Sequence, residues 1–320
     1  MQPEFICIGF QKCGTTTLYD LLRQHRGIVL TSDVKEPMIY REDFFYKLLG
    51  GKQWYEKRFF GSIAEDDKRL RGEVNAGLGL NGCAEKIGKD YSKDTKLIFM
   101  MRSPVDRAYS AYKYFLAEGF LPVHIMKIDR RNGHAEGFDN YVRYVLGSRT
   151  RRGEIMKHRQ RYLVFSQGNY GTLINEYLEY FPKENMHFIF FEDFVKDEYA
   201  ACLELYEFLG IENDPAIHYG LKSNEGNIRA RNSAWSKAGY CDMGVYYCLY
   251  EFMDCSHRHP GIYKVYRTKI HEPLQNRCMV KETDSGAVLP ETRELLERYY
   301  APEVREASEI TGRDLQKIWY

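Results

Sequence analysis

The sequence lacks three features that would place it in a specialised class of protein. No apolar run approaches the ~20 residues that cross a bilayer, and no basic segment followed by an apolar one opens the chain as in a secretory leader. Neither sign of charge predominates, because 46 Lys and Arg face 45 Asp and Glu for a net charge of +1. Cysteine is sparse, with 8 in 320 residues. We therefore expect a soluble cytoplasmic protein with reduced thiols and no nucleic-acid partner.

Internal repeats and low-complexity tracts are also missing, which leaves a single α/β domain over residues 1–320 as the simplest organisation. Short apolar runs alternate with segments of helical periodicity, a pattern that predicts one doubly wound, mainly parallel sheet flanked by helices. The expected strands are 5–8, 28–31, 96–101 and 187–191, and the expected helices are 16–25, 104–115, 170–181 and 199–209. Two irregular segments, about 120–165 and 235–285, are expected to be elaborations of the domain.

The stretch "FICIGFQKCGTTTLYDLL" passes from an apolar run through a short loop into a helical pattern. Gly9 and Gly14 have the spacing of the two glycines of a nucleotide-binding P-loop, but Thr15 stands where the lysine of that motif belongs and Lys12 lies inside the loop. A strand–loop–helix of this kind aims backbone N–H groups and the helix dipole at one point. The loop therefore predicts a phosphate or sulfate site, the alternative being a turn with surface threonines.

A second segment, "MMRSPVDRAYSAYKYF", follows the apolar run "KLIFMM". P-loop kinases hold Mg²⁺ with an aspartate after a second strand, and this strand ends in Arg102 instead. Ser103 before Pro104 predicts the start of a helix, and Arg102 with Ser110 could then grip a second phosphate. The alternative is a capped helix with an ion-paired arginine. No metal is expected.

These two segments resemble the phosphate-binding motifs of sulfotransferases that use 3′-phosphoadenosine 5′-phosphosulfate (PAPS). "FQKCGTTTL" is similar to their 5′-phosphosulfate loop and "RSPVDRAYSAY" to their 3′-phosphate motif. "KEPMIY" is similar to a segment of the heparan-sulfate and related carbohydrate branch, and the end of the chain resembles the closing helices of bacterial members. The resemblance implies a P-loop-like fold, PAPS as co-substrate and 3′-phosphoadenosine 5′-phosphate (PAP) as product.

The resemblance also implies roles for individual residues. Lys12 would stabilise charge on the bridging oxygen as the sulfuryl group leaves, and Glu36 would take the proton of the acceptor hydroxyl. Residues expected to bind the nucleotide are Lys12, Cys13, Gly14, Thr15, Thr16 and Thr17 in the loop, Arg102 and Ser110 at the 3′-phosphate, and Lys222, Arg229 and Arg231 in a closing loop.

Some features of the sequence differ from the sulfotransferase motifs, and others are not explained by them. Val74 in "GEVNAGL" replaces a lysine that carbohydrate relatives often carry, and Glu73 beside it is a rival base. The basic stretch 149–161 could steer an anionic acceptor, although a solvated face is the simpler interpretation. Three cysteines seven residues apart, followed by two histidines, fit a buried seam better than a zinc site; they are Cys241, Cys248, Cys255, His257 and His259.

The sequence as a whole thus favours a PAPS-dependent sulfotransferase that acts on an acceptor hydroxyl, with a carbohydrate or glycoconjugate as the preferred acceptor. A small-molecule natural product is an alternative acceptor. A P-loop kinase and a non-catalytic nucleotide-binding protein are the alternative functions. The sequence identifies neither the acceptor nor the oligomeric state.

Overall fold

The computed structural model describes residues 2–31, 35–37, 39–41, 43–80, 82–117, 121, 135–147, 164–220, 228–230, 265–271, 273–274, 279–281 and 286–320. The chain divides into two compact units. Unit 1 contains Met1–Pro104, Gln167–Asn224 and Ala301–Tyr320, and unit 2 contains Val105–Ser166 and Glu225–Tyr300. The expectation of one domain over 1–320 stays a prediction.

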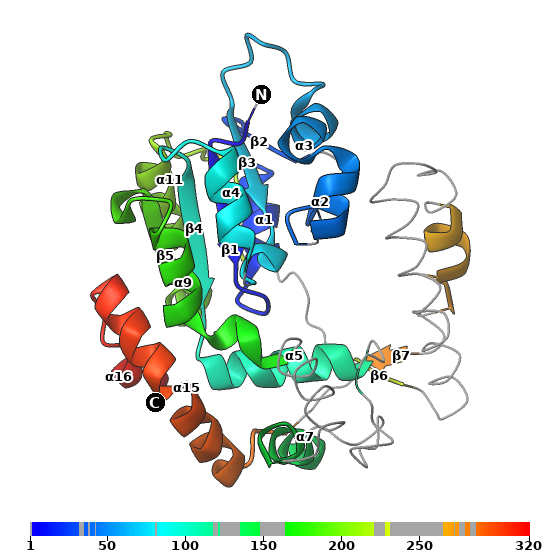
Figure 1. Cartoon of the computed structure of the whole chain (residues 1–320), viewed down its shortest axis with the longest axis vertical. Helices are drawn as coiled ribbons and strands as arrows, with labels where there is room; N and C mark the ends of the chain where they lie inside the picture. Colours follow the sequence, from blue (N-terminus) through cyan, green and yellow to red (C-terminus); the bar gives the residue numbers. More distant parts are fainter. Residues whose placement is uncertain are drawn as a thin grey trace. The chain divides into compact units, whose positions relative to one another are not determined.

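Unit 1 is built on a five-stranded sheet in the order β2-β3-β1-β4-β5, in which every neighbouring pair is parallel (Figure 1). The predicted doubly wound parallel sheet is therefore confirmed. The strands are β1 (Phe5–Gly9), β2 (Ile28–Leu30), β3 (Leu70–Val74), β4 (Lys96–Met101) and β5 (Met186–Phe190). All five residues of β1 are buried, as expected for a strand covered on both faces.

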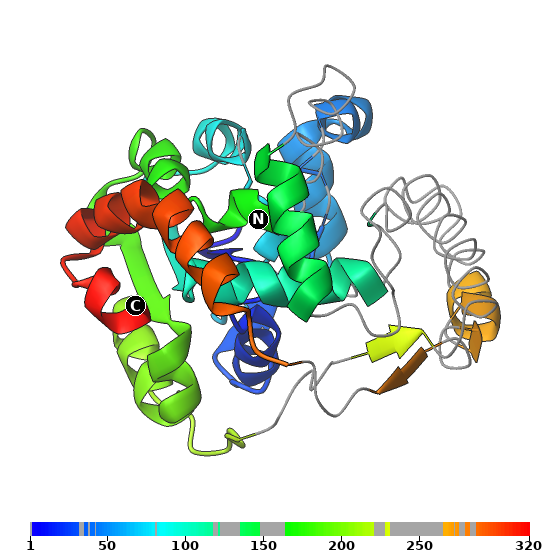
Figure 2. The ribbon, with the colours of Figure 1, turned by 90° about the horizontal axis from the view of Figure 1, so that it is seen from below.

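Helices cover both faces of this sheet. Helices α4 and α9 lie on one face and α1 and α11 on the other (Figures 1 and 2). The helices wholly in unit 1 are α1 (Thr15–Leu22), α2 (Asp43–Leu49), α3 (Gly51–Phe60), α4 (Cys83–Asp90), α9 (Tyr170–Leu178), α10 (Phe191–Lys196), α11 (Glu198–Leu209) and α16 (Leu315–Trp319), with the short 3-10 helices η1 (Ala76–Leu78) and η4 (Lys183–Asn185).

Unit 2 has an aromatic core. It contains nearly all of α5 (Pro104–Ala117), α7 (Ala135–Gly147), the first half of α15 (Pro290–Thr311) and an antiparallel pair, β6 (Ile228–Ala230) and β7 (Met279–Lys281). Tyr112 packs against Phe138 and Tyr141, with ring centroids 5.1 and 5.4 Å apart. The fully buried Arg107 donates from its guanidinium to the Val164 carbonyl. Two short segments complete the secondary structure at the edges of the described ranges, η3 (Ser166–Gly168) and η6 (Arg267–His271).

The sequence analysis missed β3. Its residues "LRGEV" include Arg71, Gly72 and Glu73, which interrupt the apolar run that marks a buried strand. Gly72 is required there because a Cβ would approach the Phe5 ring to 2.0 Å. The predicted strand 187–191 ends one residue early, since Phe191 begins α10. Most of the expected elaborations, 120–165 and 235–285, lie outside the described residues.

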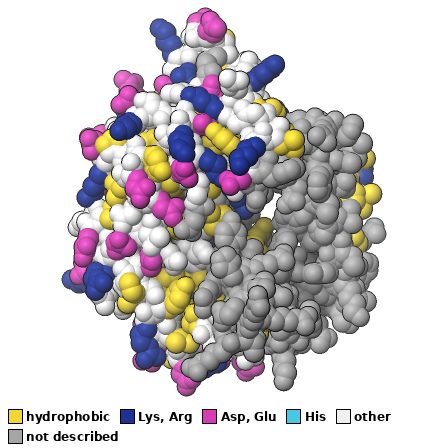
Figure 3. All heavy atoms as spheres, in the orientation of Figure 1, with side chains coloured by type: hydrophobic (Ala, Val, Ile, Leu, Met, Phe, Trp, Pro, Cys, Tyr) yellow, Lys and Arg dark blue, Asp and Glu magenta, His cyan; other side chains and the backbone are white. Residues whose placement is uncertain are grey.

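Charge and thiol chemistry agree with the composition. On the face drawn in Figure 3, Lys and Arg side chains alternate with Asp and Glu over the described residues. The four cysteines that the structure describes are buried thiols, and burial raises the pKa of Cys7 to about 12. Within the described ranges, no helix has both the length and the apolar character needed to cross a membrane. The cytoplasmic location stays a prediction.

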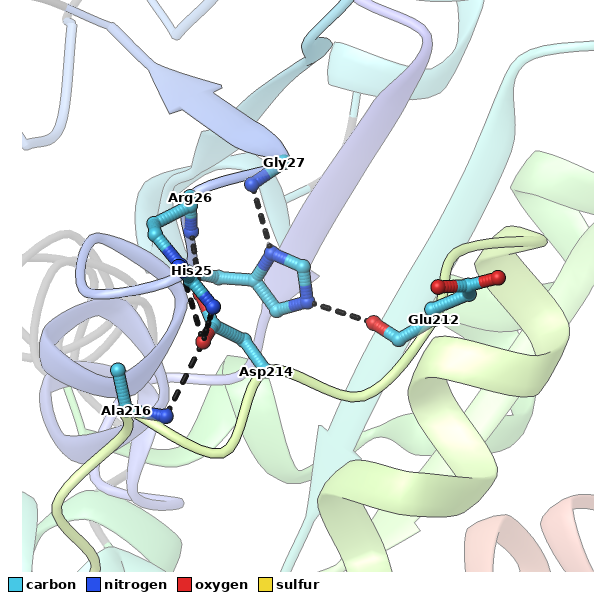
Figure 4. A network of polar contacts seen from close by, with 6 residues as sticks. All are labelled: His25, Arg26, Gly27, Glu212, Asp214 and Ala216. Atoms are coloured by element: carbon cyan, nitrogen blue, oxygen red, sulfur yellow. Dashed lines mark hydrogen bonds and ion pairs between the residues drawn. The ribbon is translucent and has the colours of Figure 1, made fainter.

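A polar network joins the turn after α1 to the loop after α11 (Figure 4). The Arg26 guanidinium donates to both carboxylate oxygens of Asp214, at 2.9 and 3.0 Å, and the Ala216 amide donates to the same carboxylate. Gly27 N–H donates to His25 Nδ1, so His25 Nε2 carries the proton and donates to the Glu212 carbonyl at 2.9 Å. These hydrogen bonds hold in place the turn that leads into β2.

We expect Asp214→Asn to lower the melting temperature by a few degrees at pH 7. Hydrogen bonds from Arg26 hold the pKa of Asp214 well below its usual range, so the carboxylate stabilises the fold above the unfolded-state pKa of about 3.9. That contribution disappears as the pH falls through the folded-state pKa. Calorimetry should therefore give a constant difference in melting temperature from pH 8 to pH 5 and a smaller one below about pH 4.

Asp67→Asn is the matched control. Asp67 pairs with Arg69 two residues away in an exposed turn, at 2.7 Å, and joins no distant segments. Its replacement should leave the melting temperature nearly unchanged. Equal melting temperatures for wild type and Asp214→Asn at pH 7 would contradict the proposed role of the network.

Candidate functional site

The loop between β1 and α1 lies at the carboxyl end of the strands, where the strand order reverses around β1. This is the crevice in which doubly wound sheets bind ligands. Lys12 adopts a left-handed conformation with φ +68°, and Gly14 has φ +94°. Neighbouring strands and loops hold the loop: Phe10 N–H donates to the Met100 carbonyl at 2.8 Å and Gln11 N–H to Gln167 Oε1 at 2.7 Å.

The start of α1 has the features of an anion-binding helix N-terminus. Gly14 is the N-cap, and among the described residues no side chain caps this helix. The first helical hydrogen bond runs from Leu18 N–H to the Gly14 carbonyl, so the N–H groups of the first turn are directed out of the helix. A Cβ on Gly14 would lie 3.2 Å from the Phe191 ring. Conformation and space therefore both require glycine beside the anion position.

The predicted loop residues gather at this point. Lys12 and Cys13 lie in the loop, and Thr15, Thr16 and Thr17 form the first turn of α1. Thr15 is 5% exposed, and Thr16 Oγ1 accepts a hydrogen bond from Lys35 Nζ at 2.8 Å. The site is therefore richer in positive charge than the loop alone suggests.

Lys35 is the functional residue that the sequence analysis missed. Its Nζ lies 3.3 Å from Glu36 Oε1 as well as beside Thr16. The expected lysine of the next motif is replaced by Val74, which is fully buried at the end of β3. Lys35 brings a cation to the same crevice from a different segment, and its position next to Glu36 in "KEPMIY" was the signal that could have identified it.

The two candidate bases differ in exposure. The Glu36 side chain is 37% exposed, whereas Glu73 is 1% exposed. Glu73 Oε2 accepts from the Tyr55 hydroxyl, and Glu73 Oε1 accepts from Asn75 Nδ2 at 2.7 Å. Both carboxylate oxygens of Glu73 therefore have partners within the protein, while Glu36 is accessible to a ligand.

The buried carboxylate is connected to the segment that carries Glu36. Asn75 Nδ2 also donates to the Pro37 carbonyl at 2.8 Å, and Asn75 Oδ1 accepts from Gly77 N–H at 3.0 Å. Burial raises the pKa of Glu73 to about 7, against the opposing effect of the hydrogen bonds from Tyr55 and Asn75. Glu73 is thus connected through Asn75 to the backbone at Pro37.

Arg102 follows directly after β4. Its guanidinium carbon lies 4.5 Å from the centroid of the Phe191 ring, and its Nη1 is 3.4 Å from the Lys12 carbonyl. Phe191 therefore contacts Arg102 and closes the space beside Gly14. Ser110 lies on α5 in unit 2, and its predicted role with Arg102 stays a prediction.

Several predicted residues cannot be assigned to the site. Lys222 and Arg231 lie outside the described residues, and only the backbone of Arg229, in β6, is described. The basic stretch 149–161 and the segment of Cys241, Cys248, Cys255, His257 and His259 are also outside. Within the described residues, no group of three or more His, Cys, Asp or Glu side chains could hold a metal ion.

Comparison with known proteins agrees with this geometry. A family model for the sulfotransferase domain matches residues 84–228. The human bifunctional heparan sulfate N-deacetylase/N-sulfotransferase 2 is 24% identical over 220 residues, which are 68% of this chain and 23% of the relative. The chain is therefore similar to sulfotransferases over these residues. The match agrees with the prediction of a transferase enzyme.

Two further comparisons extend the family match. The Dictyostelium discoideum membrane-associated sulfotransferase kil1 is 31% identical over 112 residues, 35% of this chain and 23% of that protein. A solved sulfotransferase from Alicyclobacillus acidocaldarius has a TM-score of 0.61 at 19% identity and covers 99% of this chain and 98% of its own. That likeness concerns the fold. The chain spans about a quarter of the length of the curated relatives named here.

The raised pKa of Glu73 predicts a pH-dependent effect of Glu73→Gln on stability. The folded-state pKa of about 7 exceeds the unfolded value of about 4.3, so ionisation of Glu73 destabilises the fold as the pH rises. Glutamine does not titrate. As the pH rises from 5 to 8, the free energy of unfolding of Glu73→Gln should therefore increase relative to that of wild type by on the order of 3 kcal/mol. Urea unfolding at four pH values measures the difference.

Glu36→Gln serves as the control, because its side chain is 37% exposed whereas Glu73 is buried. Its difference from wild type should vary less with pH. A Glu73→Gln difference that stays constant from pH 5 to pH 8 would mean that Glu73 is not a strained buried carboxylate.

Proposed function

We propose that the protein is a PAPS-dependent sulfotransferase that transfers a sulfuryl group to a hydroxyl of a carbohydrate or glycoconjugate. The observation that carries the proposal is the pairing of two anion-binding elements. The uncapped start of α1, with Lys12 and Lys35 near it, lies beside Arg102, whose guanidinium reaches the Lys12 carbonyl. A nucleotide with phosphates at both its 5′ and 3′ positions has the charge distribution for such a pair.

The residues present fit this donor. Gly14 allows the left-handed turn into α1, and the threonine hydroxyls of the first turn would be donors for a 5′-phosphosulfate. Arg102 supplies a planar set of donors for a 3′-phosphate, the group that distinguishes PAPS from adenosine 5′-phosphosulfate. PAPS supplies an activated sulfuryl group with a good leaving group.

The transfer exchanges one S–O bond for another. The acceptor oxygen forms a bond to sulfur while the bond between sulfur and the bridging oxygen of the 5′-phosphate breaks, and that oxygen keeps the electron pair. Lys12 would stabilise the charge that grows on the bridging oxygen. The acceptor proton would pass to the exposed Glu36 carboxylate, with Lys35 Nζ 3.3 Å from its Oε1.

The acceptor class is supported by the relatives. The human protein that matches over 68% of this chain is named as a bifunctional heparan sulfate N-deacetylase/N-sulfotransferase. A carbohydrate is therefore our first choice of acceptor class, and the choice of a hydroxyl rests on the sequence resemblance alone. A small natural product is the alternative, and a screen with ³⁵S-labelled PAPS against glycosaminoglycan oligosaccharides and phenols separates the two.

The first test of the donor compares PAP with adenosine 5′-phosphate, which differs only in the 3′-phosphate. Wild type should bind PAP more tightly. Arg102→Ala should remove a charge-assisted contact and lower the affinity for PAP by roughly 10- to 100-fold, with little change for adenosine 5′-phosphate. Isothermal titration calorimetry measures both.

Arg69→Ala removes a similar charge from an exposed turn and is the control for net charge. Equal affinity of wild type for the two nucleotides would overturn the 3′-phosphate assignment. Turnover of ATP with Mg²⁺ would instead support a kinase, and PAP binding with no transfer to any acceptor would support a binding protein.

The second test concerns the base. Glu36→Gln keeps the size of the side chain and removes the carboxylate, so kcat should fall by roughly 10² or more while PAP affinity changes little. Glu73→Gln should keep most of the activity, because Glu73 is buried and does not reach a ligand. Both variants are assayed with the acceptor from the screen. If Glu73→Gln is inactive while Glu36→Gln is active, the base is Glu73.

A further inference from the structure

Arg102 is held by contacts that the proposed reaction does not itself require. The Tyr170 hydroxyl donates to the Arg102 carbonyl at 2.8 Å and accepts from the Arg102 amide at 3.3 Å. One side chain thus restrains the backbone on both sides of the Arg102 Cα. Tyr170 is fully buried on α9, and its hydroxyl oxygen also lies 3.6 Å from Cys13 Sγ in the loop.

The next residue is restrained from another direction. Ser103 N–H donates to Glu192 Oε1 at 2.9 Å. The other oxygen of that carboxylate, Oε2, accepts from Trp319 Nε1 at 3.1 Å. The Trp319 ring packs against the Tyr170 ring, with centroids 5.7 Å apart. Tyr170, Glu192 and Trp319 therefore form a connected set around the peptide of Arg102 and Ser103, which we call the α16 clamp.

Helix α16 is itself fixed to the sheet. Asp314 caps it by accepting from Lys317 N–H, and Arg313 Nη1 lies 2.6 Å from Asp193 Oδ2 on α10. The Arg313 guanidinium also stacks over Phe190, 4.3 Å from the ring centroid. Trp319 is therefore presented to Glu192 by a docked helix, and it is 7% exposed.

We propose that Trp319, Glu192 and Tyr170 are positioning residues for Arg102, so that α16 sets the preference of the protein for nucleotides carrying a 3′-phosphate. The inference rests on the proposed function, because it assigns Arg102 to that phosphate. A guanidinium on a restrained backbone loses less conformational freedom on binding than one on a mobile backbone. Loosening the clamp should therefore weaken the 3′-phosphate contact while the 5′ site on α1 is unaffected.

Trp319→Phe tests the clamp with little risk to the fold, because it keeps an aromatic ring against Tyr170 and removes only the N–H donor. Calorimetric titration with PAP and with adenosine 5′-phosphate should give a loss of about 3- to 10-fold for PAP and less than about 2-fold for adenosine 5′-phosphate. Tyr170→Phe should likewise lower the affinity for PAP more than the affinity for adenosine 5′-phosphate.

Tyr177→Phe is the matched control. Tyr177 is on the same helix and equally buried, but its hydroxyl donates to the Leu78 carbonyl. This variant should lose thermal stability and keep the wild-type ratio of PAP to adenosine 5′-phosphate affinity. A change in that ratio for Tyr177→Phe would mean that any buried hydroxyl on α9 has the effect, and would overturn the inference.

A double-mutant cycle provides the sharpest test. In an Arg102→Ala background, Trp319→Phe should cause no further loss of PAP affinity, because the clamp acts through Arg102. Additive losses, equal losses for both nucleotides, or an unchanged ratio in Trp319→Phe would each overturn the inference. Wild type that does not prefer PAP would instead refute the assignment of the 3′-phosphate, and the inference with it.

Discussion

The site depends on one constraint: α1 must begin with backbone N–H groups that no side chain among the described residues caps. Gly14 satisfies it by adopting a left-handed conformation and by carrying no Cβ toward Phe191, which is 3.2 Å from where that atom would be. A helix start without a side-chain cap favours an anion, because its N–H groups and its dipole carry partial positive charge. The cations Lys12 and Lys35 increase the preference for a negatively charged partner.

The segment that carries the proposed base, Glu36, is connected to a second carboxylate, Glu73, which is buried. Glu73 is held by Tyr55 and Asn75, and Asn75 continues to the Pro37 carbonyl, one residue beyond Glu36. A buried, hydrogen-bonded group of this kind costs free energy, since its pKa is raised by desolvation. The cost is consistent with a part in shaping the segment 35–37, which has few other anchors to the sheet among the described residues.

The fold and the loop could be predicted from the sequence because they rest on local patterns. Apolar runs mark β1 and β4, and glycine with threonine marks the turn into α1. Strand β3 was missed because Arg71, Gly72 and Glu73 replace the apolar residues expected of a buried strand, and Gly72 is explained only by the Phe5 ring that lies over it. Phe191 and Trp319 contact residues that are distant in the sequence, Arg102 and Glu192, and no spacing rule reveals such contacts.

The end of β4 shows how one position determines which chemistry the crevice suits. A carboxylate there would favour a metal ion between protein and phosphate, as in P-loop kinases. Arg102 instead offers a positive charge directly, and Phe191 and the Tyr170 hydroxyl limit where that charge can go. Direct contact between arginine and phosphate is geometrically demanding, because the planar guanidinium must match the anion's oxygens. We therefore expect the position of Arg102 to be restrained. A buried tyrosine, a carboxylate and a tryptophan surround its peptide with Ser103.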